Sequence, residues 1–317
     1  MIRTTTRNRG SCLILGGCGF IGSHVAEGLL EAGYHVRVFD KINVSTRNID
    51  HLISEIDLRE GDFTDEEAVG SALQKIDYLY HFVGTTLPKT STDNPVYDVE
   101  SNVVGTLKLL DRAAREQVKK VIFCSSGGTV YGIPQTIPIP EDHSTNPTCS
   151  YGISKLTIEK YLELYYRTRG LHYLCFRLSN PYGERQNVHS IQGAIAVFLG
   201  LVKDEKPLVI WGRGETTRDY IYVRDIVPIF VKAVDVNPPW RVLNLGSGQG
   251  TTLNELVALI KDVTRRKIAV CHTEERTIDV PVNVLDISRI RQAFDFTPQT
   301  SLAEGILRTW EWLLQFS

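Results

Sequence analysis

Tyr151 and Lys155 have the spacing of a pair that could move a proton. They form the only Tyr-x-x-x-Lys among the 13 tyrosines of this 317-residue chain, and they open the helical pattern of residues 151–168. Residues four apart lie on one face of a helix. A phenol has a pKa of about 10, so Tyr151 can act as a base at neutral pH only where a nearby cation stabilises its phenolate. Lys155 can supply that charge, although an isolated pair of this kind is also typical of a surface aromatic-cation contact.

A glycine-rich turn near the start of the chain has the spacing of a phosphate-binding loop. The apolar run Cys12–Leu15 breaks into Gly16-Gly-Cys-Gly-Phe-Ile-Gly22 and resumes as a helical pattern, which is the order strand, turn, helix. Glycines let the backbone approach a diphosphate closely, and N–H groups at a helix start bind anions. Gly22 would let the helix pack close to the strand. The residues predicted to bind the diphosphate of a dinucleotide are Gly16, Gly19, Phe20, Ile21 and Gly22.

An acidic residue follows the next predicted strand. The β-like run Tyr34–Phe39 ends at Asp40, about 20 residues beyond the turn, where a carboxylate can bind the 2′-hydroxyl of a ribose. Asp40 would also repel a 2′-phosphate, which favours NAD over NADP, although Lys41 could offset part of that repulsion. The alternative is an ordinary glycine turn with a solvated Asp. The strand-turn-helix-strand order favours NAD, whose oxidised nicotinamide would be a second cation for Tyr151.

The first half of the chain predicts an α/β fold. From Cys12 to Arg177, apolar runs rich in β-branched residues alternate with helical patterns, which indicates a Rossmann-type, doubly wound parallel sheet with helices on both faces. The expected strands are Cys12–Leu15, His35–Phe39, Ile56–Arg59, Tyr78–Phe82, Lys120–Cys124 and His172–Arg177. In such sheets ligands bind beyond the carboxyl ends of the strands. Residues that directly follow these strands are therefore candidates for the site.

The second half is less regular and predicts a smaller C-terminal α/β substrate-binding lobe. We expect the NAD-binding domain in residues 11–182 plus about 219–245, the lobe in 183–218 and 246–317, and a flexible tail in 1–10. The helix 224–234 and the strand 241–245 are expected to return to the main sheet. The glycine cluster Gly246-Ser-Gly-Gln-Gly250 lacks an acidic strand end about 20 residues later and is interpreted as a tight structural turn.

Composition favours a protein of the cytoplasm. The net charge is −2 without a strong basic block, so nucleic acid is not an expected partner. The six cysteines are scattered without metal-ligand spacing, and no run is long and apolar enough for a membrane span or leader. Long amphipathic patterns in 94–115 and 151–168 suggest a homodimer interface, and packing on the sheet explains them about as well.

In combination, these motifs resemble an extended short-chain dehydrogenase/reductase, in the branch of NAD-dependent nucleotide-sugar epimerases and dehydratases. The resemblance covers nearly the whole chain. Its motifs are Gly16-x-x-Gly-Phe-Ile-Gly22, Asp40, Gly61-Asp62, His81-Phe-Val-Gly84, Asn102-x-x-Gly-Thr106, Ser126 to Gly132, Tyr151-x-x-x-Lys155, Arg177-x-x-Asn-Pro-x-Gly183, Arg218-Asp-Tyr-x-Tyr-Val-x-Asp225, Asn244-Leu-Gly-x-Gly248 and Arg276-x-x-Asp279. It implies that Lys155 also holds the nicotinamide ribose. It further implies contacts to NAD from Asp62 and Phe63 at the adenine, and from Phe82, Val83, Gly84 and Asn102 along the dinucleotide.

The same resemblance implies a sugar nucleotide as substrate. Asn180, Arg218 and Arg276 would bind its diphosphate and nucleoside, and arginine suits that role because its planar fork pairs with phosphate oxygens. A surface salt bridge, for example between Arg218 and Asp219, is the alternative.

One position departs from the family pattern. The family usually has a catalytic Ser or Thr where this chain has Gly127. Ser126, Thr129 or a water in the space that Gly127 leaves could replace the hydroxyl that shares the substrate's proton with Tyr151. Related 4,6-dehydratases carry an Asp-Glu pair in this stretch, and Gly127-Gly-Thr129 has no acid, so elimination is not expected.

These implications favour epimerisation at C4 of a UDP-sugar. Tyr151 would take the proton of the 4-hydroxyl while NAD holds the hydride. A net reductase, dehydratase or decarboxylase of the same family, or a non-catalytic NAD-binding regulator, are the alternatives. In related 4-epimerases a bulky Tyr at the position of Asn283 excludes an N-acetyl group, so the smaller Asn283 predicts that a UDP-N-acetylhexosamine is accepted beside a UDP-hexose. The alternative for Asn283 is a cap on the turn before Leu285.

Overall fold

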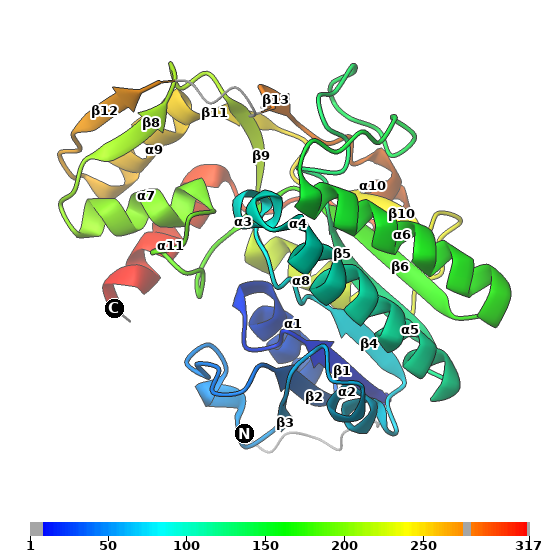
Figure 1. Cartoon of the computed structure of the whole chain (residues 1–317). Coiled ribbons are helices and arrows are strands. Elements are labelled where there is room, and N and C mark those ends of the chain that lie inside the picture. Colours follow the sequence, from blue (N-terminus) through cyan, green and yellow to red (C-terminus); the bar gives the residue numbers. More distant parts are fainter. Residues whose placement is uncertain (1–8, 275–279, 316–317) are drawn as a thin grey trace. The chain divides into compact units, whose positions relative to one another are not determined.

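A seven-stranded sheet forms the centre of the fold. The structure, a computed structural model, describes residues 9–274 and 280–315. The sheet has the strand order β10-β6-β5-β4-β1-β2-β3 (Figure 1). Its strands are β1 (Ser11–Leu15), β2 (His35–Asp40), β3 (Asp57–Glu60), β4 (Tyr78–His81), β5 (Lys120–Ser126), β6 (His172–Leu178) and β10 (Val242–Leu245). The six strands predicted in the first half, and the return of strand 241–245 to this sheet, are confirmed.

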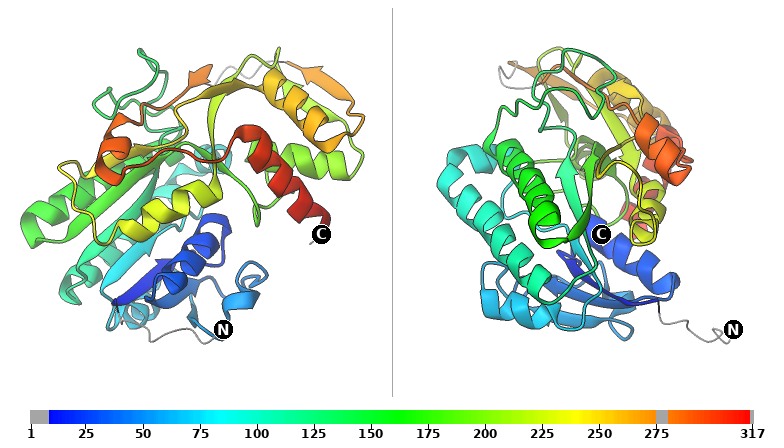
Figure 2. Two further views of the ribbon diagram at one scale, coloured as in Figure 1. Left: turned by 180° about the vertical axis from the view of Figure 1, so that it is seen from behind. Right: turned by 90° about the vertical axis from the view of Figure 1, so that its right-hand side faces the viewer.

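Helices cover both faces of this sheet, as the alternating pattern predicts. Helices α2 (Glu66–Leu73), α5 (Gly105–Arg115) and α6 (Ser150–Arg169) lie on one face, and α1 (Phe20–Glu31) and α8 (Val223–Lys232) lie on the other (Figure 2). Strand β1 is buried almost throughout, which explains its continuous apolar run. The doubly wound α/β class is therefore confirmed.

The remaining elements are shorter. They are η1 (Asp50–Leu52), α3 (Pro88–Asp93), α4 (Pro95–Asp98), η2 (Val99–Val104), β7 (Asn180–Tyr182), α7 (Ala194–Lys203), β8 (Leu208–Trp211), β9 (Thr217–Tyr222), β11 (Gly250–Thr252), α9 (Leu253–Thr264), β12 (Val270–Thr273), β13 (Val282–Asn283), α10 (Ser288–Phe294) and α11 (Leu302–Gln315). Strand β9 pairs with β7, β11 and β13, and β8 pairs with β12.

The amphipathic segment 94–115 is not one regular helix. It begins as α4, continues through the π-helical turn η2 and becomes α5 only at Gly105. A π-turn shifts the side chains that follow it relative to an α-helical register, and such turns are frequent at functional sites. Here η2 carries Asn102, whose side-chain bonds are described below.

The chain forms two compact units. Unit 1 comprises Met1–Ser125, Cys149–Phe176 and Val227–Val242, and unit 2 comprises Ser126–Thr148, Arg177–Ile226 and Leu243–Ser317. The chain passes from one unit to the other near the ends of β5 and β6, just before α6, within α8 and at the start of β10. These boundaries differ from the expected ones chiefly because residues 126–148 and 177–182 belong to unit 2.

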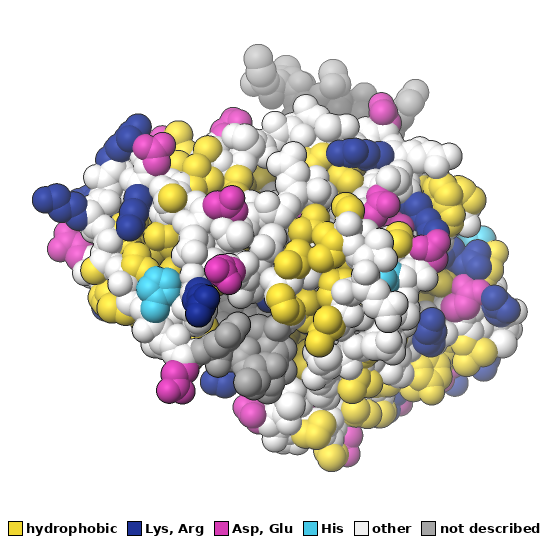
Figure 3. Space-filling view, turned by 90° about the horizontal axis from the view of Figure 1, so that it is seen from above, with side chains coloured by type: hydrophobic (Ala, Val, Ile, Leu, Met, Phe, Trp, Pro, Cys, Tyr) yellow, Lys and Arg dark blue, Asp and Glu magenta, His cyan; other side chains and the backbone are white. Residues whose placement is uncertain are grey.

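The outer surface mixes charges of both signs. In the face drawn in Figure 3, Lys and Arg side chains are interspersed with Asp and Glu, and hydrophobic side chains gather in several places between them. Within residues 9–274 and 280–315, no helix combines the length and the apolar character that crossing a membrane requires.

Candidate active site

The glycine-rich turn of unit 1 leaves no space for larger residues. Gly16 has a φ of 80°, and a Cβ on Gly22 would lie 2.3 Å from the carbonyl oxygen of Gly16. Gly19 is the N-cap of α1, whose first turn has neither a side-chain cap nor an acidic residue. The N–H groups of this helix start can therefore face an anion. A Cβ on Gly16 would also lie 3.3 Å from the backbone nitrogen of Val83, so the turn and the segment after β4 are adjacent.

Asp40 lies at the end of β2, beside this turn. Its Oδ2 accepts a hydrogen bond from the Cys18 N–H (3.0 Å), and its Oδ1 accepts one from the Lys41 N–H (2.9 Å). The carboxylate is thus held at the turn by backbone donors, where the sequence places the ribose-binding acid. Asn48, which the sequence motifs do not single out, donates to the Cys18 carbonyl (3.0 Å) and fixes the same turn from the next loop.

The two residues predicted to contact the adenine, Asp62 and Phe63, differ in their exposure to solvent. Asp62 accepts hydrogen bonds from the N–H and hydroxyl of Thr64 (2.8 and 2.7 Å), which lower the pKa of its carboxyl, and it is exposed. Phe63 is buried, with its ring against His81 (centroids 5.3 Å apart) and 2.9 Å from where a Cβ on Gly105 would lie. The Phe63 side chain is therefore a core residue, and only its backbone can border a nucleotide.

Tyr151 and Lys155 lie in the first two turns of α6. The backbone N–H of Tyr151 donates to the Ser91 hydroxyl (2.9 Å), which provides from α3 the cap that Cys149 does not. Lys155 is buried, and its Nζ donates to the Cys124 carbonyl (3.0 Å) and lies 5.6 Å from the centre of the Tyr151 ring. The two side chains share one face of the helix, as their spacing predicts.

A small cavity joins this pair to the segments beside the glycine turn. It lies within unit 1 and has room for about one water molecule. Its lining residues are Val83, Asp98, Asn102, Thr106, Tyr151, Ser154, Lys155 and Ile158. Asn102 is fixed there, because its Oδ1 accepts the Thr85 N–H (3.0 Å) and its Nδ2 donates to the Asp98 carboxylate (3.0 Å).

Electrostatics in this cavity oppose ionisation of the phenol. Burial raises the pKa of Tyr151 above its ordinary value, and the carboxylate of Asp98 raises it further. Burial also lowers the pKa of Lys155. Lys155 by itself therefore does not make Tyr151 a base at neutral pH, and a second cation is required. An oxidised nicotinamide beside the cavity fits that need.

A second pocket lies within unit 2. It is open to solvent and combines aromatic and aliphatic walls with a few polar groups, the usual make-up of a small-molecule site. Its lining residues are Asn180, Pro181, Tyr182, Gly193, Ala194, Ile195, Trp211, Thr216, Arg218, Tyr220 and Leu253. Two of the three predicted sugar-nucleotide ligands, Asn180 and Arg218, thus lie on one pocket. The third, Arg276, is outside the described residues.

Arg218 does not pair with its neighbour Asp219. Its guanidinium donates to the carbonyls of Thr217 (2.9 Å) and Val280 (2.7 Å). Asp219 is buried and accepts the N–H groups of Ser247 (2.8 Å) and Gly248 (3.1 Å). The salt bridge between the two is therefore not formed, and the glycine cluster after β10 is a tight structural turn, as predicted.

The sequence motifs do not identify the apolar residues that line this pocket. Trp211 and Tyr220 belong to strands β8 and β9 and line it beside Arg218. Trp211 is 43% exposed at the end of a strand, and an exposed aromatic there is the signal that could have identified it. Aromatic faces of this kind can stack against a nucleobase.

Gly127, in unit 2, has no space beside it. A Cβ at this position would lie 2.6 Å from Leu285 Cδ1 and 3.0 Å from the Arg177 carbonyl oxygen. Leu285 is fully buried and fills the volume that a Ser or Thr side chain would need. A water held in the space left by Gly127 is therefore excluded as the replacement for the missing hydroxyl.

The two hydroxyl candidates near Gly127 differ in their surroundings. Ser126 ends β5, and its carbonyl accepts the N–H of Thr129 (3.3 Å). Thr129 Oγ1 is buried and has no hydrogen-bond partner among the described residues. Both remain candidates for the proton-sharing role.

Asn283 does not lie on the wall of the unit 2 pocket. It is 1% exposed on β13, and its Nδ2 donates to the Gly127 carbonyl (3.1 Å). The Nδ2 of this amide therefore bonds Gly127 and does not cap the turn before Leu285, while the contact of Asn283 with a sugar stays a prediction. Its Oδ1 is buried without a partner among the described residues.

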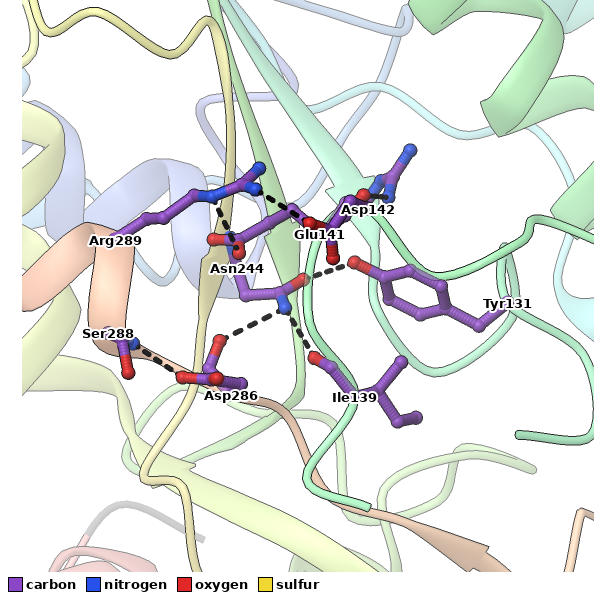
Figure 4. A network of polar contacts seen from close by, with 9 residues as sticks. Tyr131, Ile139, Glu141, Asp142, Asn244, Asp286, Ser288 and Arg289 are labelled. Carbon is purple, nitrogen blue, oxygen red and sulfur yellow. Dashed lines mark hydrogen bonds and ion pairs between the residues drawn. The ribbon is translucent and has the colours of Figure 1, made fainter. Parts of the chain in front are cut away.

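A polar network in unit 2 fixes the segment that follows Gly127 (Figure 4). Asn244 is its centre: it accepts the Tyr131 hydroxyl (2.6 Å) and donates through Nδ2 to the Ile139 carbonyl (2.8 Å). The Asn244 N–H donates to Glu141 (2.9 Å), whose other oxygen faces Arg289 (3.5 Å). Burial still raises the pKa of Glu141. The network thereby anchors the loop around residues 131–141.

The chain is similar to known enzymes over nearly its whole length. Residues 12–246 match the NAD dependent epimerase/dehydratase family. A putative UDP-glucose 4-epimerase of Methanocaldococcus jannaschii is 33% identical, with 95% of this chain and 97% of that protein covered. The crystal structure of a Thermotoga maritima UDP-glucose 4-epimerase with UDP-glucose is 34% identical with a TM-score of 0.91, covering 96% of this chain and 99% of that one. A Methanobrevibacter ruminantium UDP-N-acetylglucosamine 4-epimerase in complex with UDP-N-acetylmuramic acid is 28% identical with a TM-score of 0.91, covering 98% and 100%.

Proposed function

The chain belongs to the NAD dependent epimerase/dehydratase family, and from this premise we propose that it epimerises a nucleotide sugar at C4. One observation carries the proposal most directly. Tyr151 and Lys155 share a buried cavity with Val83 and Asn102, and Val83 lies against the glycine turn. A base and a dinucleotide site are thus joined within unit 1.

Each residue then has a defined task. Bound NAD supplies reversible hydride chemistry at C4 of the sugar. Tyr151 Oη takes the proton of the 4-hydroxyl and returns it after the keto sugar has turned over. Lys155 holds the nicotinamide ribose and adds positive charge, while Ser126 or Thr129 shares the proton. Because the hydride returns to the sugar, no net oxidation or reduction occurs and the cofactor stays bound.

We assign the nucleotide sugar to the pocket of unit 2. Arg218 and Asn180 would bind the diphosphate, and Trp211 would contact the base, since the three line one pocket. The two solved relatives are named for UDP-glucose and UDP-N-acetylglucosamine. We therefore propose UDP-hexoses and UDP-N-acetylhexosamines as the substrate class.

The test is a panel of UDP-, dTDP- and GDP-sugars followed by NMR, with wild-type protein and Tyr151→Phe. We expect the wild type to interconvert the C4 epimers of a UDP-sugar without accumulating NADH. Tyr151→Phe should keep bound cofactor and lose activity by about 10²-fold or more, the usual contribution of a positioned acid-base group. Stoichiometric NADH change would indicate a reductase or decarboxylase, and cofactor binding without any turnover would indicate a regulator.

We also propose that two copies associate through one face of unit 1. Ile153 and Leu164 are 51% and 47% exposed and lie 11 residues apart on α6, close to three helical turns and hence on one face. Val96, Tyr97 and Val104 are exposed on α4 and η2, which contact each other, and α6 contacts both. Light scattering should show a dimer for the wild type and a monomer for Ile153→Glu. Ile191→Glu, which changes an isoleucine of unit 2 that is 62% exposed, should remain dimeric.

A further inference from the structure

Asp98 is a buried carboxylate at the end of α4, outside the motifs that identify the family. It is 0% exposed. Its Oδ1 accepts hydrogen bonds from the Thr86 hydroxyl and from Asn102 Nδ2 (3.0 Å). Its Oδ2 accepts bonds from the hydroxyls of Ser150 (2.9 Å) and Ser154 (2.6 Å). Four donors on two oxygens match the acceptor capacity of an ionised carboxylate.

The two oxygens face different parts of unit 1. Oδ1 is bound to the loop after β4 and to η2, which carry the predicted dinucleotide contacts Val83 and Asn102. Oδ2 is bound to the first turns of α6, where Ser150 precedes Tyr151 and Ser154 precedes Lys155. One side chain therefore connects the cofactor side of the cavity to the helix that carries the base.

Asp98 also contributes charge at the cavity it lines. Several titratable side chains influence the pKa values of the pair. Around Tyr151 these are Cys124, Cys149 and Asp98. Around Lys155 they are Cys124, Cys175, Asp98 and Glu159, and Lys155 in turn influences the pKa of His81. Burial raises the pKa of the thiols of Cys124 and Cys149 and holds the pKa of His81 at about 3, so these three are uncharged at neutral pH. Glu159 accepts the Ser125 hydroxyl (2.6 Å) and acts on Lys155.

We propose that Asp98 is the positioning residue of the proton-transfer pair: its carboxylate fastens α6 to the dinucleotide-binding segments and places a negative charge at the cavity that Tyr151 and Lys155 line. The inference rests on the proposed function. The π-turn η2 carries Asn102, whose Nδ2 donates to the oxygen of Asp98 that also accepts the Thr86 hydroxyl.

Three variants separate the structural tie from the charge. Asp98→Asn removes the charge and keeps the size, and serine hydroxyls can accept from its new amide group as well as donate. Ser154→Ala removes one tie and leaves the charge. Asp93→Asn changes an exposed aspartate on the neighbouring α3 and is the matched control. Thermal unfolding of each variant verifies that it is folded.

The first measurement is the pH profile of the 4-epimerase rate. The second is an ultraviolet titration of the Tyr151 phenol, obtained as the difference between each variant and the same variant with Tyr151→Phe. Activity rises as Tyr151 loses its proton, so removing a nearby negative charge moves the acid limb to lower pH. We expect Asp98→Asn to move this limb, and the phenol titration with it, by about one pH unit downwards. Ser154→Ala should lower kcat about tenfold at unchanged limb position, since misplaced groups lose rate without changing charge. Asp93→Asn should match the wild type in both.

An unmoved limb and titration in Asp98→Asn would overturn the charge role, and an unchanged kcat in Ser154→Ala would overturn the tie. The phenol titration does not require turnover, so it tests the charge role even if the proposed reaction fails, and that failure would show separately as a wild-type protein that converts no nucleotide sugar.

Discussion

The contact between Gly127 and Leu285 makes a quantitative prediction. A Cβ on Gly127 would lie 2.6 Å from Leu285 Cδ1, about 1 Å closer than carbon atoms pack at their optimum. Leu285 is fully buried, and the Arg177 carbonyl blocks the other side at 3.0 Å. Gly127→Ser should therefore lower the free energy of unfolding by about 1–3 kcal/mol, the cost of overpacking a core.

The second substitution tests the cause. Leu285→Ala alone should cost about 2–5 kcal/mol, because it removes three buried carbons and leaves a cavity. In Gly127→Ser/Leu285→Ala the new hydroxymethyl group occupies part of that cavity. We expect the double variant to lose at least about 1 kcal/mol less than the sum of the single variants, a coupling typical of residues in contact.

Urea unfolding of the three variants and the wild type measures this coupling. Strict additivity would refute the reasoning, because it would mean that the two side chains do not compete for one volume. The same variants address the missing hydroxyl. If a hydroxyl at position 127 suits proton sharing, the double variant should have a higher kcat than Leu285→Ala alone, and Thr129→Val should then cost the double variant less rate than it costs the wild type.

Three further predictions concern unit 1. Gly22→Ala should abolish retention of NAD after gel filtration, because the new methyl carbon would lie 2.3 Å from a backbone carbonyl oxygen that cannot yield; retained cofactor would contradict this. Asp40→Ser should raise the affinity for NADP relative to NAD by about tenfold in direct titrations, since the carboxylate that repels a 2′-phosphate is gone. Burial would raise the pKa of Glu163, but hydrogen bonds from Arg241 and Arg167 hold it at about 2. A carboxyl whose pKa is lowered in the folded state stabilises the protein at pH values above its unfolded pKa of about 4.3. This contribution to the free energy of unfolding is lost as the pH falls towards 2. Glu163→Gln should thus cost up to about 3 kcal/mol at pH 7, less what solvent screens at this partly exposed side chain, and flatten the acid loss seen in urea unfolding.

The strands and the glycine turn could be predicted because local sequence determines them. A buried parallel strand has a continuous apolar run, and a turn whose next Cβ would strike a carbonyl oxygen requires glycine, as at Gly22. Tyr151 and Lys155 share a helical face for the same local reason. Segment 94–115 is different: its apolar spacing suits a helix throughout, but the structure has a π-turn at Val99–Val104, where Asn102 accepts a hydrogen bond from Thr85, 17 residues away, that no local pattern contains.

Sequence alone does not predict the positions where a side chain contacts a residue that is distant in the sequence. The family resemblance implies a sugar-contacting residue at Asn283, but its amide donates to Gly127, a residue 156 positions away that lacks a side chain of its own. Leu285, two residues further on, fills the volume beside the same glycine. The absence of a side chain at Gly127, the buried Leu285 beside it and the buried amide of Asn283 therefore belong to one packing arrangement. Substituting Asn283 by a bulky residue would disturb this arrangement before it could narrow a sugar pocket, so sugar preference must be tested with the substrate panel rather than with that substitution.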